Sequence, residues 1–156
     1  FETVGYNVEG NEVGAAFGLT QLNKLNQNIE TRQNNFKRQC EFFSRHSDYF
    51  IIPEETAGSE TAWLAFPILI KDDSPFTRTE FQIYLEKRNI QTRVVFTGNI
   101  NRQPGFININ KKVTEEGYPN ADRIMRKGVL LPLHHGMTDV MFQKLHDTID
   151  EFLTQY

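Results

Sequence analysis

Apolar residues recur at helical spacing through the first third of the 156-residue chain, and this pattern constrains the fold more than any other feature. The apolar set comprises Val13, Ala16, Phe17, Leu19, Leu22, Leu25, Ile29, Phe36, Cys40 and Phe43. Asn23 and Asn26 are poor helix-interior residues, so they predict a break between two helices, over 12–22 and 25–46. Together the helices would span about 50 Å, whereas a compact chain of this length has a radius of gyration of about 15 Å. The sequence therefore predicts a helical arm that protrudes, lies against another domain or subunit, or bends back sharply.

Shorter patterns fill the rest of the chain and alternate between strand and helix. They predict strands at 50–52, 61–70, 91–96 and 129–131, helices at 77–88, 119–127 and 138–153, and an ordered loop at 97–113. Thr77 and Glu80 form a capping-box pattern, Pro119 suits the first turn of a helix, and Thr138 is a favourable N-cap. Pro67 indicates an edge strand or a bulge. The apolar face of the last helix is predicted to consist of Val140, Met141, Leu145, Ile149, Phe152 and Leu153.

This order of elements is typical of an α+β domain, in which helices cover one face of a small, mostly antiparallel sheet. The chain carries 17 basic and 20 acidic residues, and a net charge of −3 argues against a nucleic-acid partner. A single cysteine, Cys40, excludes an internal disulfide and a cysteine-based zinc site. No stretch approaches the ~20 apolar residues of a membrane helix, so we expect no membrane association and a cytoplasmic location.

Residues that could perform covalent chemistry are few. The eight lysines fall on polar helix faces or in turns, and none is expected in the apolar surroundings that activate a catalytic lysine, so we assign no catalytic residue to this chain. Cys40 is predicted to be a buried structural thiol. His134 and His135 are adjacent and cannot point the same way from a strand, so no metal site is predicted there. His134 is expected to line a site or to be structural, whereas His46 and His146 are expected to face solvent.

One segment is unusual for a purely structural domain. Residues 92–104 place Arg93, Asn99 and Arg102 around the exit of a strand. Guanidinium and amide groups suit a ligand that carries phosphate or many hydroxyls. The alternative is an ordered loop whose amides satisfy its own backbone.

Several motifs resemble a known family when they are taken in order. They are Gly5-Tyr6-Asn7, the run from Asn11 to Ala16, the run from Gly18 to Leu25, Thr92-Arg93, Phe96-x-Gly98-Asn99-x-x-Arg102-Gln103-Pro104, the run from Pro119 to Met125, and Leu131-Pro132-Leu133-His134. Together they resemble the DegT/DnrJ/StrS family of pyridoxal-phosphate-dependent sugar aminotransferases. The form that the motif takes in this chain around Arg102, Gly98-Asn99-x-x-Arg102-Gln103-Pro104, is most similar to the branch that contains the sugar 3-dehydrases.

The resemblance implies an assignment for the whole chain. Residues 1–156 would be the C-terminal small domain of the aspartate-aminotransferase fold (type I), with 1–46 as connecting loop and arm. The large domain, which holds the cofactor ring and the lysine or histidine that acts on it, would be absent from this chain. The full-length enzyme would use pyridoxal or pyridoxamine phosphate on nucleotide-linked 4-keto-6-deoxy sugars, in deoxysugar or lipopolysaccharide O-antigen synthesis. The isolated chain would be inactive and would bind no cofactor.

The resemblance also implies site residues and a partner. Asn7 would reach the cofactor phosphate of a neighbouring subunit in a homodimer, and Arg93, Asn99, Arg102 and His134 would contact the nucleotide-sugar. Glu9 stands where the family usually has Arg, Gly14 where it has Gln, and His135 where Pro often follows. A non-catalytic sugar-nucleotide-binding or assembly module, or a plain structural domain, remains as an alternative.

Overall fold

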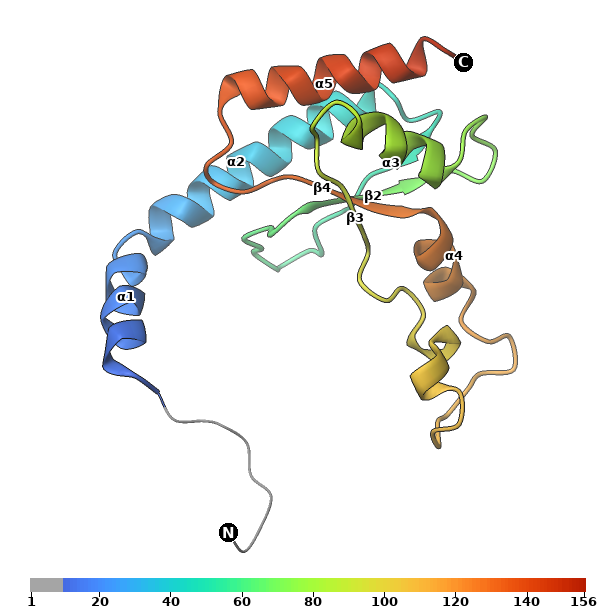
Figure 1. Ribbon diagram of the computed structural model, residues 1–156, viewed down its shortest axis with the longest axis horizontal. Helices are drawn as coiled ribbons and strands as arrows, with labels where there is room; N and C mark the ends of the chain where they lie inside the picture. The colour runs from blue at the N-terminus through green and yellow to red at the C-terminus, as the bar shows by residue number, and fades with distance from the viewer. Residues whose placement is uncertain (1–9) are drawn as a thin grey trace, which may run out of the picture.

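The computed structural model describes residues 10–156 and confirms the α+β prediction. Four antiparallel strands form one sheet in the order β1-β2-β4-β3, with bounds Phe50–Ile51, Phe66–Ile70, Gly128–Leu131 and Arg93–Val94 in that order. The helices are α1 (Glu12–Leu22), α2 (Leu25–Ser44), α3 (Arg78–Glu86), α4 (Pro119–Lys127) and α5 (Asp139–Leu153). Helices α2, α3 and α5 lie on one side of the sheet, and α4 with the loop before it lies on the other side (Figure 1).

The core fills the space between the sheet and the three covering helices. In β2, Phe66, Ile68 and Ile70 are buried while the residues between them are half-buried, as alternation along a strand requires. Phe43 of α2 is fully buried at the centre of an aromatic cluster. Its ring lies 5.3 Å from the rings of both Phe50 and Phe66. These aromatic side chains supply much of the apolar area that stabilises the domain.

Local sequence signals explain where several helices begin. Thr77 accepts a hydrogen bond from the Glu80 amide and Glu80 bonds back to the Thr77 amide, so the predicted capping box is confirmed. Thr138 caps α5 through the Met141 amide. The break predicted near Asn23 is also confirmed, because α1 ends at Leu22 and α2 begins at Leu25.

Four details of the strand and helix predictions are wrong. The strand expected at 61–70 begins only at Phe66, and the one expected at 91–96 is limited to Arg93–Val94. Pro67 lies in the central strand β2, but β1 pairs only with Leu69 and Ile70, so Pro67 has no neighbour on that side and its missing N–H costs no ladder bond. In α5, Val140 and Met141 are exposed, and Phe142 is buried instead.

Helix α1 extends away from the body of the domain, as the long arm predicted (Figure 1). None of its residues is buried. Val13, Phe17 and Leu22 are 81%, 67% and 62% exposed, and apolar side chains occur on every side of the helix. A helix that is apolar all round is typically buried on several sides in its functional assembly. Over residues 10–156, none of the helices combines the length and the hydropathy that a bilayer crossing needs.

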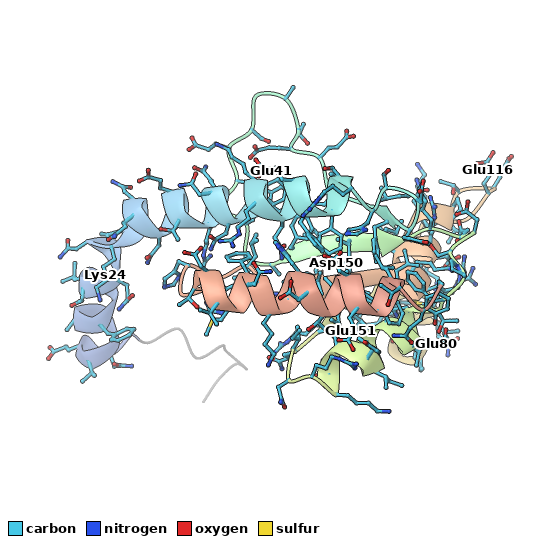
Figure 2. All side chains as sticks on the ribbon, turned by 90° about the horizontal axis from the view of Figure 1, so that it is seen from above. Lys24, Glu41, Glu80, Glu116, Asp150 and Glu151 are labelled. Atoms are coloured by element: carbon cyan, nitrogen blue, oxygen red, sulfur yellow. The ribbon has the colours of Figure 1, made fainter. Side chains whose placement is uncertain are left out.

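Two histidines predicted to face solvent lie instead between α2 and α5, which run side by side in both views (Figures 1 and 2). His146 of α5 stacks on Phe42 with ring centroids 3.9 Å apart, and its Nε2 lies 2.8 Å from Gln39 Oε1. His46 pairs with Asp150 at 2.9 Å. Helical spacing placed His146 on the polar side of α5, but α2 covers that side as well.

Acidification is expected to destabilise the domain through His146. Burial, with the positive charges of Arg38 and Arg45, lowers the pKa of His146 from 6.5 to about 4, while Asp150 and Asp147 oppose the shift. The folded chain therefore binds this proton more weakly than the unfolded chain, and the stabilisation present above pH 6.5 is lost as the pH falls toward 4. We expect a loss of about 1–2 kcal/mol between about pH 7.5 and pH 5, after allowance for solvent screening.

Urea unfolding of the parent chain and of His146→Gln at the two pH values measures this loss. The free energy of unfolding of the variant should no longer depend on pH in this range, whereas that of the parent should. Equal pH dependence in both chains would assign the effect to other groups.

Candidate functional site

A pocket of about 680 Å³ opens where β4 ends, between the start of β3 and the first turns of α5. Its size falls within the range of small-molecule sites. The lining residues are Leu64, Ala65, Asn89, Ile90, Gln91, Arg93, Phe96, Leu130, Leu131, Pro132, Leu133, His134, Met137, Met141, Lys144 and Leu145. The wall is mainly apolar, with a few basic and amide side chains.

Two of the residues predicted to bind substrate meet at this pocket. Arg93 comes from β3, opposite Leu130 of β4, and His134 follows β4 on the way to α5. The side chain of Arg93 is exposed and makes no hydrogen bond or ion pair with residues 10–156. Its guanidinium is therefore available to a ligand.

The backbone around His134 fixes which ring nitrogen carries the proton. The Gly136 amide donates to His134 Nδ1 at 3.2 Å, so the neutral ring carries its hydrogen on Nε2. Asn35 of α2 donates from Nδ2 to the His134 carbonyl oxygen at 3.1 Å. His134 is thus held as a hydrogen-bond donor through Nε2.

The other two predicted substrate residues, Asn99 and Arg102, lie away from the pocket lining and converge on Asp122 of α4. Asn99 is buried and donates from Nδ2 to Asp122 Oδ1 at 2.7 Å, while its own Oδ1 accepts from the Asn101 amide. Arg102 makes a two-point contact with the same carboxylate, from Nε at 3.1 Å and from Nη2 at 2.8 Å. These bonds from Arg102 and Asn99 lower the pKa of Asp122 to about 2. The side chain of Asn99 is used inside the protein, whereas Arg102 is 61% exposed and its Nη1 bonds to none of the described residues.

Gly98 makes the close approach that holds this loop against α4. Its φ is +62°, and a Cβ there would lie 2.3 Å from Met125 Cβ. The atoms that Gly98 approaches closely are therefore those of Met125. Phe96, two residues earlier, has a φ of +46° and is 79% exposed at the pocket. Anchoring of the loop by Gly98 and Asp122 thus fixes the segment that presents Phe96.

Sequence reasoning missed Lys144, Phe96 and Asp122. Lys144 lines the pocket beside Met137 and Met141, and its side chain is exposed. The helical spacing from Met141 to Lys144 to Leu145 is the signal that could have found it. Asp122 carried no such signal, because its partners lie 20 and 23 residues earlier in the chain.

Residues 1–150 match the family of DegT/DnrJ/EryC1/StrS aminotransferases. The chain belongs to this family. Two similar proteins are the lipopolysaccharide biosynthesis protein RfbH of Salmonella typhimurium and the dTDP-4-dehydro-2,6-dideoxy-D-glucose 3-dehydratase of Saccharopolyspora spinosa. Each is 32% identical, over 97% and 99% of this chain and over 35% and 33% of the relative. The chain thus spans about a third of the length of these relatives.

Solved structures of the DegT/DnrJ/EryC1/StrS family share the fold. GDP-4-keto-6-deoxy-D-mannose-3-dehydratase from Escherichia coli, with bound hydrated pyridoxal phosphate, is 26% identical, with a TM-score of 0.80 over 94% of this chain and 37% of that chain. A mutant of GDP-4-keto-6-deoxymannose-3-dehydratase with bound GDP-perosamine gives a TM-score of 0.83 at 26% identity, over the same shares. The aminotransferase fold inferred from the resemblance is confirmed.

Every lysine from residue 10 onward is exposed or half-buried. Asn7 and Glu9, which the resemblance relates to the cofactor phosphate, lie outside the described residues. Gly14, the other departure in this part of the family pattern, donates its amide to Asn11 at the start of α1. Cys40 is half-buried against the core, and burial raises the pKa of its thiol. Within residues 10–156, no cluster of three or more His, Cys, Asp or Glu side chains is arranged to hold a metal ion.

Proposed function

We propose that residues 1–156 are the C-terminal small domain of a cytoplasmic pyridoxal- or pyridoxamine-phosphate enzyme that acts on nucleotide-linked 4-keto-6-deoxy sugars. The similarity of nearly the whole chain to one third of sugar 3-dehydratases carries this proposal. A larger cofactor-binding domain would supply the rest of the enzyme, including the lysine or histidine that acts at the cofactor. The cofactor, when bound, serves as an electron sink.

We assign the enzyme to the 3-dehydratase branch, in deoxysugar or O-antigen synthesis. Similar proteins include three named as 3-dehydratases, from Saccharopolyspora spinosa, Yersinia pseudotuberculosis and Escherichia coli. A transaminase is the second candidate, because a dTDP-4-amino-4,6-dideoxy-D-glucose transaminase of Shigella dysenteriae is 28% identical over 95% of the chain.

The described residues divide the binding work between them. Arg93 and the Nε2–H of His134 would donate to substrate oxygens at the pocket. Arg102 would offer a further donor outside the pocket lining, through an Nη1 that bonds to none of the described residues. Asn99 would act through Asp122 by holding Arg102 and the loop in place. Asn7 would contact the cofactor phosphate of the neighbouring subunit, which makes the proposed enzyme a homodimer.

Turnover by the full-length protein that contains this chain tests the proposal. Supplied with the cofactor and with GDP- or dTDP-linked 4-keto-6-deoxy sugars, it should remove the 3-hydroxyl group. Transfer of an amino group would support the second candidate. Replacement of Arg93 by alanine should raise KM about ten-fold or more through loss of a charge-assisted hydrogen bond, with cofactor retention unchanged. Arg45→Ala provides the control, since Arg45 is exposed at the end of α2 and lies outside the pocket lining.

Two outcomes would contradict the proposal. A full-length protein that retains the cofactor but leaves every such sugar unchanged would refute the catalytic function. Nucleotide-sugar binding by a protein that never retains the cofactor would instead identify a non-catalytic binding module.

The exposed arm predicts self-association of the isolated chain. Val13, Phe17 and Leu22 expose most of their apolar side chains, and in the proposed enzyme the large domain or the second subunit would cover them. Sedimentation should therefore show concentration-dependent association. The double substitution of Phe17 and Leu22 by serine should abolish this association without changing the circular dichroism spectrum of the protein. A parent chain that remains monomeric and binds no hydrophobic dye would contradict this expectation.

A further inference from the structure

We propose that Lys144, with Arg93 and His134, forms a phosphate-binding site in the pocket at the end of β4. The site would take an organic phosphate whose apolar or aromatic body packs on the wall of the pocket. This inference deepens the proposed function and rests on it for the identity of the ligand as a nucleotide-sugar. The chemistry of the pocket itself supplies the reasons.

The positive charges of Arg93 and Lys144 lie in a pocket whose lining contains no acidic residue. Arg93 comes from β3 and Lys144 comes from α5. Neither side chain makes an ion pair or hydrogen bond with residues 10–156. Four of the eight other arginines in that part of the chain form ion pairs: Arg38 with Asp139, Arg88 with Glu151, Arg102 with Asp122 and Arg123 with Asp72, at 2.6–3.0 Å. A ligand with negative charge would supply the partner that residues 10–156 do not supply to Arg93 and Lys144.

The imidazole ring of His134, the third polar group of the site, also favours a ligand that accepts hydrogen bonds. Because the Gly136 amide donates to Nδ1 of His134, the neutral ring offers an N–H from Nε2. Guanidinium, ammonium and this imidazole N–H are all donors. A phosphate group presents several acceptor oxygens and two negative charges, and it matches this donor set better than a neutral hydroxyl does. The whole chain carries a net charge of −3, so the attraction is local to the pocket.

The apolar part of the pocket lining suits a planar or apolar body. Leu131, Leu133 and Leu145 are buried members of this lining, and Phe96 is a largely exposed one. An exposed aromatic ring can stack on a nucleobase or on the pyridine ring of a cofactor. Two sources of organic phosphate therefore share this chemistry: the nucleotide of the substrate and a pyridine-type cofactor.

A binding titration on the 156-residue chain tests the site. The probes are inorganic phosphate, GDP and pyridoxamine 5′-phosphate, followed by amide chemical shifts in two-dimensional NMR. We expect saturable shifts at Phe96, His134 and Lys144 that weaken as salt is added. Lys144→Gln should weaken binding about tenfold through loss of a charge-assisted contact. Lys37→Gln is the matched control, because Lys37 is an exposed lysine of α2 outside the pocket lining.

The two ring-bearing probes separate the sources. Tighter binding of GDP assigns the site to the nucleotide, and tighter binding of pyridoxamine 5′-phosphate assigns it to the cofactor. No binding of any probe to the folded chain, or equal binding by the parent and Lys144→Gln, overturns the proposal. The site and the proposed function can be refuted separately. If the full-length protein turns over its substrate and Lys144→Gln leaves KM unchanged, only the phosphate site is refuted. If phosphate binding depends on Lys144 but the full-length protein shows no turnover, only the enzymatic function is refuted.

Discussion

Replacing Phe43 by alanine is expected to cost about 3–5 kcal/mol of folding stability, which is the usual cost for a fully buried phenylalanine. The Phe43 side chain has no exposed surface and packs edge-on to Phe42 and Phe50 and against Phe66 of the sheet. The cavity left by alanine would separate α2 from β1 and β2 at once. Domains of this kind are stable by about 5–15 kcal/mol, so the variant should be partly or wholly unfolded near room temperature in mild urea. Urea unfolding followed by circular dichroism measures the loss.

Phe17→Ala is the matched control on the same arm. Phe17 is 67% exposed on α1, so its loss should change the free energy of unfolding of the monomeric chain, measured at dilution, by less than about 0.5 kcal/mol. Equal losses in the two variants would show that α1 packs on the domain in solution. A small loss for Phe43→Ala would show that α2 contributes little to the core.

Gly98→Ala is expected to release the loop between β3 and α4, with a local loss of about 2–4 kcal/mol. The left-handed backbone at this residue costs alanine about 1–2 kcal/mol. The remainder comes from overpacking, since the added methyl would lie 2.3 Å from Met125 Cβ. Hydrogen exchange of the Gly98, Arg102 and Gln103 amides reports the change, because all three bond within this loop. Their protection should fall while that of β2 remains.

Gly117→Ala separates backbone strain from crowding. Gly117 has a φ of +71°, but no atom lies within 4 Å of its added Cβ. This variant should therefore show the strain cost alone, and the amides of the Gly98 loop should stay protected. If Gly98→Ala leaves those amides as protected as Gly117→Ala does, the contact with Met125 does not hold the loop.

Local sequence signals were sufficient to predict where helices begin and end, because interactions between near neighbours in the chain determine those positions. The capping box at Thr77, the N-cap at Thr138 and the helix break after Leu22 each depend on neighbours within four residues, and each is where the pattern placed it. Strand bounds were less accurate. Where a strand ends depends on its partner: Thr61 to Ala65 have strand-like composition, but no neighbouring strand pairs with them.

The candidate site was predictable only where a residue's role depends on type rather than on distant partners. Arg93 and His134 were singled out and both line the pocket. Asn99 and Arg102 looked equally suited to a ligand, but a carboxylate 20 or more residues away occupies them. His146 shows the same limit, because nothing near it in the sequence predicts that Phe42 of another helix covers its ring. Contacts across long separations decide these roles, and a single sequence does not encode them in its local pattern.

The chain has a single tryptophan, Trp63, and its ring lies flat on Phe36 of α2 with centroids 4.1 Å apart. Because Trp63 lies three residues before the start of β2 at Phe66, this stack joins the helical arm to the segment that leads into the sheet. The intrinsic fluorescence of the unlabelled protein is therefore an optical reporter of whether α2 is docked. Its emission should shift to longer wavelength when Phe43→Ala exposes the indole to water. In Gly98→Ala the emission should stay unchanged, because the loop released there lies on the other side of the sheet.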